Sequence, residues 1–352
     1  MVSRRNHSVV NGLIDSGGYQ ISTGKLHYSA STHYAMLRYA EQFEAACILD
    51  APTSAIGQRG FSTFEDCLRF TYRNGRYTIR NRKEGATHFL NVIQGRSLNE
   101  ARTWLDAVKS LNDPRVHGSR ALEGWAYAGA TRTHLSIVLE LLVRLRDENL
   151  LRPDAYVHFL GLGSPAIACV LTAIQDGLHE TVGQGITVSF DNATPFLMAG
   201  EFQKGLCSPV WPRKSLAVRQ VRMPNGPEHV GSEEPWPCSS PIADRLTLGD
   251  LNVRKRDGRQ CWDAVSGALV MAHNTWVLSA AIADANRSLR LGLGAALGRL
   301  PANVVEMVEL VREILRSENP GRLITRHKRL LDSLSSKSRN TRLIDDPDGI
   351  DR

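Results

Sequence analysis

The sequence predicts an α/β fold, a (β/α)8 TIM-barrel-like protein, from the spacing and the ends of its apolar segments. Short apolar segments end in small or polar residues at 13–18, 45–53, 88–95, 124–130, 156–165 and 186–195. With one residue near the end of each as a mark, the steps are 35, 44, 34, 32 and 31 residues. That spacing is typical of strand–helix units in a parallel sheet. The segments lack strict polar alternation, so we expect helices to cover the sheet.

The stretches between these segments are expected to be helical. The segments that begin at Ser62 and Ser97 both open with a Ser-x-x-Glu capping box, and apolar residues recur at helical spacing in 133–151 and 164–174. An open doubly wound sheet is the alternative. A barrel is favoured because polar residues follow every strand, whereas an open sheet would concentrate them at one switch point.

The pattern changes beyond residue 200 and predicts four segments. Residues 1–204 would hold the barrel strands with the active site, and the Pro-rich 205–262 would be an insertion. Residues 263–320 read as C-terminal helices packing on the barrel, with helices expected at 263–289 and 301–319, and 321–352 as a basic and then acidic tail.

The composition indicates a soluble globular protein. The chain has 352 residues, of which 42% are hydrophobic and 22% charged. No apolar run approaches the roughly 20 residues that span a bilayer, and the N-terminus lacks a signal-peptide core. Six scattered cysteines do not form a disulfide framework. We therefore expect a cytoplasmic protein without a membrane partner.

Positive charge is concentrated near the C-terminus. Between residues 321 and 342 there are seven Lys or Arg residues, among them Arg326, Lys328 and Arg329, against the single acid Asp332, a net of +6 in a chain of +7. Such a segment favours a polyanion such as nucleic acid, and a solvated helix with a frayed tail is the alternative.

Three carboxylates directly follow predicted strands. They are Asp15, Asp50 and Asp191. In a barrel they would meet at one mouth, where paired carboxylates can divide into a nucleophile and a proton carrier. Gln94 would add an amide, and glycines at 129, 161 and 163 would leave backbone groups open to a flat ligand. The alternative for any single Asp is a helix cap.

These segments resemble the tRNA-guanine transglycosylase superfamily. "LIDSGGYQ" resembles its Asp-Ser-Gly-Gly-Phe/Tyr-Gln signature, and "CILDAPT", "FLNVIQG", "GWAYAGA", "HFLGLGSP" and "SFDNATP" follow in the family's order. "MAHNTWVL" is similar to a later His-Asn-Leu helix. The resemblance covers roughly residues 11 to 290.

The resemblance implies a role for each matching residue. Asp191 matches the nucleophile that attacks the sugar C1′, and Asp15 the general base that deprotonates the incoming 7-deazaguanine. The base would be held by Ser16, Tyr19, Asp50, Gln94, Gly129, Leu160 and Gly161. In the family Tyr19 corresponds to a stacking aromatic and Leu160 to a residue lining the other side. Two displacements would retain the sugar configuration.

The chain departs from the family pattern in three respects, of which the first two are the N-terminal strands and the zinc site. The family barrel has two strands before the Asp-Ser-Gly-Gly strand, and only about ten residues precede it here. The first two strands are therefore lacking or replaced: the frame starts late, the barrel is open, or other segments fill the gap. The family's Cys-x-Cys-x-x-Cys…His zinc site is degraded, since Ser240 and Ala243 follow Cys238 at the next two ligand positions. No cofactor is certain, and zinc on His273 with Cys207, Cys238 or Cys261 is one option.

The third departure concerns the substrate. After the nucleophile the chain reads Thr194-Pro195-Phe196 instead of the Pro-Thr-Arg and basic run of the tRNA enzymes. This looks more like the branch that exchanges guanine in DNA for 7-deazaguanines such as 7-cyano-7-deazaguanine, the DpdA type of phages and bacterial modification clusters. The compartment would then be the host cytoplasm if the protein is phage-encoded. Trp211 and Trp236 could stack on bases or lie in the core.

The alternatives stay open at this point. The same chemistry on tRNA is the main alternative, and a non-catalytic nucleic-acid-binding subunit is the second. A homodimer or partner modification proteins are further options.

Overall fold

The computed structural model describes residues 6, 11–58, 60–209, 215–253 and 261–334. The chain divides into two compact units. Unit 1 comprises 1–160, 174–190 and 311–352, and unit 2 comprises 161–173 and 191–310. The four segments expected from the sequence stay a prediction.

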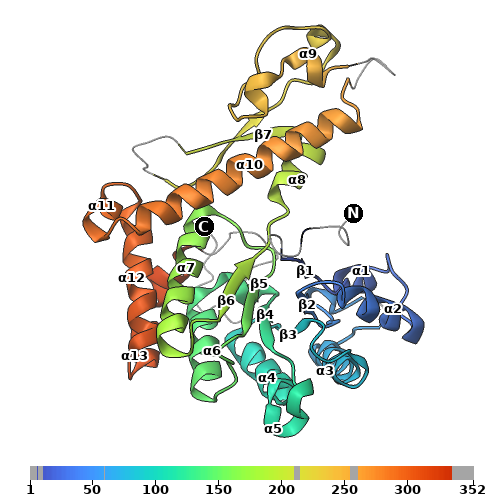
Figure 1. Ribbon diagram of the computed structural model, residues 1–352, viewed down its shortest axis with the longest axis vertical. Helices are drawn as coiled ribbons and strands as arrows, with labels where there is room; N and C mark the ends of the chain where they lie inside the picture. The colour runs from blue at the N-terminus through green and yellow to red at the C-terminus, as the bar shows by residue number, and fades with distance from the viewer. Residues whose placement is uncertain (1–5, 7–10, 59, 210–214, 254–260, 335–352) are drawn as a thin grey trace. The chain divides into compact units, whose positions relative to one another are not determined.

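Unit 1 is built on a parallel six-stranded sheet whose strands lie in chain order (Figure 1). The strands are β1 (Leu13–Ile14), β2 (Ala45–Cys47), β3 (His88–Ile93), β4 (Gly124–Tyr127), β5 (Tyr156–Phe159) and β6 (Thr187–Phe190). Each strand pairs in parallel with the next, and in the described part of the chain β1 and β6 are the two edges. The sheet is a curled half barrel. This confirms the predicted α/β, TIM-barrel-like class, and the sequential order excludes a doubly wound sheet, in which the order reverses.

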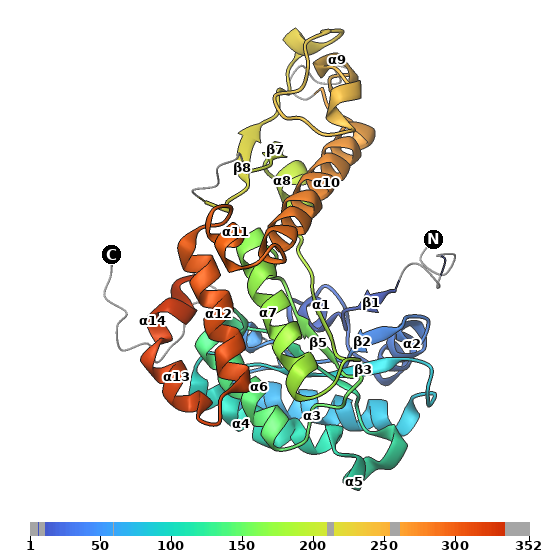
Figure 2. The same cartoon turned by 60° about the vertical axis from the view of Figure 1, so that its left-hand side comes forward.

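Helices follow the strands of unit 1 and cover the sheet (Figures 1 and 2). They are α1 (Gly18–Ser22), α2 (Ala30–Ala40), α3 (Phe64–Asn81), α4 (Leu98–Val108), α5 (Pro114–His117), α6 (Leu135–Asp147), α13 (Pro320–Arg326) and α14 (Lys328–Leu331). The residues of β2 and β4 are all buried, as expected for strands covered on both faces. The indole N–H of Trp104 on α4 donates to the Val92 carbonyl of β3 at 2.7 Å, which fixes that helix on its strand.

Two predicted helix starts differ in detail from the structure. The cap of α3 is Thr63, whose hydroxyl accepts from the Asp66 amide in a reciprocal capping box, one residue later than predicted. Ser97 does cap α4, but the Glu100 carboxylate accepts from the Arg96 amide instead of completing the box. The segment contains two overlapping cap patterns, Ser-x-x-Glu and Thr-x-x-Asp, and the second is used because Asp66 reaches both preceding amides.

Two long helices belong partly to each unit. They are α7 (Pro165–Thr181) and α12 (Ala302–Arg316). In α7 the residues up to 173 belong to unit 2 and the rest to unit 1, and in α12 the residues up to 310 belong to unit 2 and the rest to unit 1. In their unit 1 halves, Leu315 packs on Gly177, where a Cβ would lie 2.6 Å from the leucine methyl. Arg312 pairs with Asp176 at 2.9 Å. The close approach of the two helices explains why residue 177 lacks a side chain.

Unit 2 consists of an antiparallel hairpin, helices and short turns (Figure 2). Its elements are β7 (Lys204–Cys207), β8 (Arg219–Arg222), α8 (Thr194–Gly200), α9 (Leu248–Leu251), α10 (Ala264–Leu289) and α11 (Leu293–Leu297). The Asn274 amide of α10 donates to the Pro195 and Lys204 carbonyls, and its oxygen accepts from the Leu206 amide. This one side chain ties α10 to both α8 and β7.

Helix α10 is the one helix in the described residues that is long and apolar enough to cross a membrane by length and composition alone. Its most apolar stretch is 39% buried, and Val270, His273 and Val277 lie in the interior of unit 2. A core helix passes the same test, so this is weak support for a membrane span.

Candidate active site

The segment after β1 requires two glycines because it turns sharply against the end of β2. Gly17 has φ of +74°, a conformation that favours glycine. A Cβ on Gly18 would lie 2.1 Å from the Asp50 carbonyl oxygen. The close contact brings the start of α1 onto the residue that follows β2. The glycine pair therefore sets the distance between the β1 and β2 ends.

Asp15 and Ser16 lie at this turn. Asp15 is exposed, and its Oδ1 accepts a hydrogen bond from the Ser16 amide at 2.7 Å. The buried Ser16 hydroxyl donates to Asp50 Oδ1 at 3.1 Å. The structure therefore brings Ser16 and Asp50 together, with Asp15 next to them.

Asp50 is a buried carboxyl with two side-chain donors. Gln94 Nε2 donates to its Oδ2 at 2.8 Å, opposite the Ser16 bond. Burial raises the pKa of Asp50 to about 6, with the nearby Asp15 charge adding to the rise and the two hydrogen bonds opposing it. Asp50 consequently changes its charge close to neutral pH, which is where a group that exchanges protons with a ligand is useful.

Gly129 completes this network from the end of β4. It has φ of +68°, and a Cβ would lie 2.6 Å from Gln94 Oε1 and 3.3 Å from Thr53 Oγ1. Its backbone therefore lies directly against the Gln94 amide. Residues from the ends of four consecutive strands, β1 to β4, meet here in unit 1.

Two other predicted base-binding residues, Tyr19 and Leu160, belong to unit 1. Leu160 is half-buried after β5, and its amide donates to the Tyr127 carbonyl. Tyr19 belongs to α1, and its side chain lies outside the described structure.

In unit 2, Asp191 and Gly161 are hydrogen-bonded. Asp191 directly follows β6, and its Oδ1 accepts from the Gly161 amide at 2.7 Å. The side chain of the next residue, Asn192, donates to the Gly163 carbonyl at 2.5 Å and accepts from the Thr194 amide at the start of α8. A backbone N–H thus orients the carboxylate, and Asn192 holds the glycine loop beside it.

Asn192 is a residue that the sequence reasoning missed. Its signal was present, since an Asn two residues before Thr194 and Pro195 is typical of a turn that starts a helix. The contact with Gly163 is long-range in sequence and could not be read from the pattern.

The basic residues Arg326, Lys328 and Arg329 are exposed on α13 and α14. Their acidic neighbour Asp332 accepts hydrogen bonds from the Ser136 amide at 3.0 Å and the Ser136 hydroxyl at 2.8 Å. Asp332 therefore caps the N-terminus of α6, which follows the Gly129 turn, and holds the basic helices at that end. Of the other four basic residues, Arg322 is also exposed on α13, and Lys337, Arg339 and Arg342 lie outside the described residues.

His273, which matches the histidine of the family's zinc site, forms hydrogen bonds within the protein. His273 is fully buried, with Nε2 2.9 Å from the Leu206 carbonyl and Nδ1 2.8 Å from the Ser240 hydroxyl. The carbonyl can only accept, so Nε2 carries the proton and Nδ1 accepts from Ser240. Burial lowers the pKa of His273, which keeps the ring neutral. Both ring nitrogens are used by the protein.

The cysteines nearby form a thiol pair. Cys207 and Cys238 have Sγ atoms 3.0 Å apart, and burial, followed by the contact with Cys207, raises the pKa of Cys238 to about 12. A thiolate is the form that binds zinc. In the described residues no group of three or more His, Cys, Asp or Glu side chains could hold a metal ion. The side chains present do not fit a zinc site.

Trp236 packs edge-on against His273 and is buried, so it lies in the core. Trp211 lies outside the described residues.

The comparisons with known proteins point to one family. No family model matches the chain. A tRNA-guanine(15) transglycosylase of Pyrococcus abyssi (strain GE5 / Orsay) is 26% identical over 182 residues, which is 52% of this chain and 23% of the relative. Another, from Thermococcus kodakarensis (strain ATCC BAA-918 / JCM 12380 / KOD1), is 23% identical over 323 residues, 91% of this chain and 44% of the relative. The chain thus spans less than half the length of either relative. Both similarities are weak, and both are to tRNA-guanine transglycosylases, the superfamily that the sequence motifs resemble.

Proposed function

We propose that the chain exchanges guanine in a nucleic acid, preferentially DNA, for a 7-deazaguanine such as 7-cyano-7-deazaguanine. The observation that carries the proposal is the Ser16–Asp50–Gln94 network beside the glycine turn at Gly129. It combines a carboxyl and an amide side chain at neighbouring strand ends, the donor and acceptor types that the edge of a purine requires.

The reaction would take two displacements at the sugar C1′. An Asp191 oxygen attacks C1′, the bond from C1′ to guanine N9 breaks, and guanine leaves with the bonding electrons and takes up a proton. Asp15 then removes the N9 proton of the incoming base, N9 attacks C1′, and the bond to Asp191 breaks. Two inversions leave the configuration unchanged.

The Gly161 amide has a defined part in this scheme. Its hydrogen bond to Asp191 Oδ1 fixes the carboxylate orientation before attack and stabilises the negative charge when Asp191 leaves. Asp15 would act next to Asp50, whose pKa of about 6 lets it lose its proton when a base donates hydrogen bonds to it.

DNA is proposed over tRNA because Thr194, Pro195 and Phe196 replace the basic run that the family uses to read tRNA. Exposed Arg326, Lys328 and Arg329 would contact phosphates. Exchange on tRNA is the alternative and fits the similarities about equally, since both relatives are named for it. We propose a cytoplasmic location for either activity.

The test is incorporation of radiolabelled guanine by purified protein into three matched substrates: duplex DNA, single-stranded DNA and bulk tRNA. The proposal predicts label in DNA and none with Asp191→Asn. Label in tRNA alone would establish the tRNA alternative. Nucleic-acid binding without exchange on any substrate would favour the non-catalytic subunit.

A further inference from the structure

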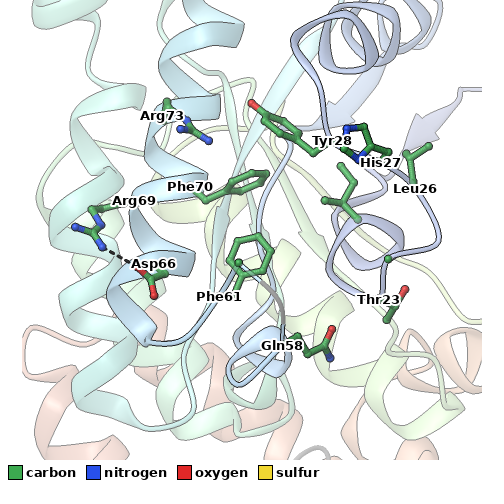
Figure 3. Close-up of a pocket in the computed structure, with 13 residues that line it drawn as sticks. Thr23, Leu26, His27, Tyr28, Gln58, Phe61, Asp66, Arg69, Phe70 and Arg73 are labelled. Atoms are coloured by element: carbon green, nitrogen blue, oxygen red, sulfur yellow. Dashed lines mark hydrogen bonds and ion pairs between the residues drawn. The ribbon is translucent and has the colours of Figure 1, made fainter.

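A cavity of about 990 Å³ lies in unit 1, lined by residues of the segments that follow the Gly17–Gly18 turn and Asp50 in the chain. Its walls are the connection from α1 to α2, the residues Gln58, Gly60 and Phe61, and the first turns of α3 (Figure 3). The volume is at the upper end of the range for small-molecule pockets and exceeds what one planar base fills. None of the motifs that led to the proposed function includes these walls.

Aromatic rings form one side of the cavity. The centroids of Phe61 and Phe70 are 5.2 Å apart at 84°, and those of Tyr28 and Phe70 are 5.0 Å apart at 63°. Figure 3 shows the three rings grouped between α3 and the 23–28 segment. The side chains of Tyr28 and Phe70 are half-buried on the cavity wall, and stacking on aromatic rings is how proteins hold unpaired bases without regard to sequence.

Two arginines one turn apart on α3 add positive charge. The guanidinium carbon of Arg73 is 5.6 Å from the Phe70 ring centroid and 5.9 Å from that of Tyr28. Among the described residues, no carboxylate lies within ion-pair distance of Arg73. The Arg69 side chain is 77% exposed and pairs with Asp66, a carboxylate that also caps α3. The cavity therefore combines ring faces with a cation that no acid neutralises.

The cavity walls are continuous with the base-binding residues. Ile21, on the cavity wall, is three residues from Gly18, which contacts the Asp50 carbonyl. On the other wall, the Thr71 hydroxyl next to Phe70 accepts from the Ala51 amide at 3.0 Å, one residue after Asp50. A chain entering the site with one base at Asp50 would have its next unit beside this cavity.

We propose that this cavity binds the nucleotide adjacent to the exchanged guanine, with its base against Phe70 and Tyr28 and its phosphate at Arg73. The inference rests on the proposed function and adds a substrate subsite to it. It requires an unpaired neighbour, since a base in a duplex cannot stack on protein rings. The enzyme would therefore prefer single-stranded or locally opened substrate.

The test compares protein variants by their KM and kcat for a single-stranded oligonucleotide. Arg73→Gln is compared with Arg76→Gln, a control that removes the same charge from an exposed position of α3 outside the cavity. Arg73→Gln should raise KM for a single-stranded oligonucleotide about tenfold and leave kcat unchanged. It should also reduce the slope of log binding constant against log salt concentration by about one, which is the effect of one lost phosphate contact. Arg76→Gln should behave like the parent. Equal KM values for the two variants would overturn the proposal.

Stacking is tested with Phe70→Ala and oligonucleotides that carry an abasic residue on either side of the guanine. An abasic residue on one of the two sides of the guanine should weaken binding to the parent by about tenfold. The same oligonucleotide should bind Phe70→Ala no more weakly than the intact one does, because the abasic residue and the Phe70 substitution remove the same stacking contact. Additive losses at both positions would contradict the assignment. If Phe70→Ala unfolds, Tyr28→Leu replaces it in the same cycle.

Anisotropy of a labelled oligonucleotide separates the two proposals. If exchange is absent but Arg73→Gln alone weakens binding, the proposed function fails and the cavity is a nucleotide-binding site without an exchange reaction. If exchange occurs with unchanged binding in Arg73→Gln, only the subsite fails. If the parent neither binds nor exchanges, both fail.

Discussion

Two buried polar clusters in this molecule contrast with each other. In unit 1, Ser16, Asp50 and Gln94, to which the resemblance assigns base binding, form a hydrogen-bonded network. In unit 2, His273 matches the histidine of the family's zinc site, but its partners are Ser240 and a backbone carbonyl. Both clusters are buried and internally hydrogen-bonded, but the first contains a carboxyl whose pKa is raised to about 6, whereas the second contains a histidine whose pKa is lowered by burial.

The contrast shows that a contact between a helix and its neighbouring segments can be made by different chemical groups. A metal at the zinc-like position would tie a helix to neighbouring strand and loop segments. Here hydrogen bonds from His273 tie α10 to β7 through Leu206 and to the loop through Ser240. Hydrogen bonds can provide a structural link of this kind, whereas only an ionisable carboxyl such as that of Asp50 can change its charge near neutral pH.

Gly18→Ala should produce the largest effect, because it forces the β1 and β2 ends apart. The new Cβ would lie 2.1 Å from a backbone oxygen, so Ser16 must move away from Asp50. We expect a loss of about 3 kcal/mol of unfolding free energy or more. Denaturant unfolding measures it. Gly267→Ala is the matched control, since nothing lies within 4 Å there and a helical alanine should be neutral or stabilising. Equal stability of the two variants would contradict the close approach.

His273→Ala should destabilise unit 2 by about 2–3 kcal/mol, because the Ser240 hydroxyl and the Leu206 carbonyl lose a buried partner. In the parent protein, EDTA should leave Tm unchanged, as measured by calorimetry. A fall in Tm with EDTA that zinc restores would show that the cluster binds metal after all.

Guanine affinity should depend on pH through Asp50. In the proposed function the base donates hydrogen bonds to the ionised carboxyl, and the Asp50 pKa of about 6 means that the proton must first leave. Affinity should therefore rise about tenfold from pH 5 to pH 7 and then level off. Titration calorimetry measures this, and Asp50→Asn should bind weakly at both pH values. A flat profile in the parent would mean that Asp50 does not contact the base.

The same shift affects stability with the opposite sense. Because the folded state raises the Asp50 pKa, the folded protein holds that proton more tightly than the unfolded chain does. The Asp50 contribution to stability is therefore greatest below the ordinary carboxyl pKa and declines as pH rises to about 6.

Asp332→Ala should have the smallest effect. It removes two hydrogen bonds at the start of α6 and should lower the unfolding free energy by about 1 kcal/mol. Asp332→Asn, which keeps an acceptor oxygen, should lose less. Thermal unfolding measures both, and two unchanged Tm values would show that the cap is not needed.

The sequence predicted the fold class because strand ends and helix patterns are local signals. It predicted Asp15, Asp50 and Gln94 as residues at successive strand ends, and it could not predict that Ser16 bridges to Asp50 across 34 residues. The Asp332 cap on α6 was missed for the same reason, since its partner is 196 residues away. The shift of the α3 cap from Ser62 to Thr63 shows that two overlapping local patterns cannot be ranked without the fold.

The most direct test of the central claim is to trap the covalent intermediate. Parent protein and Asp191→Asn are incubated with labelled oligonucleotide in the absence of any exchangeable base, denatured and analysed by intact mass. The account predicts an adduct of protein plus abasic oligonucleotide in the parent, mapped to Asp191, and none in Asp191→Asn. An adduct on another residue, or guanine exchange by Asp191→Asn at the parent rate, would contradict it.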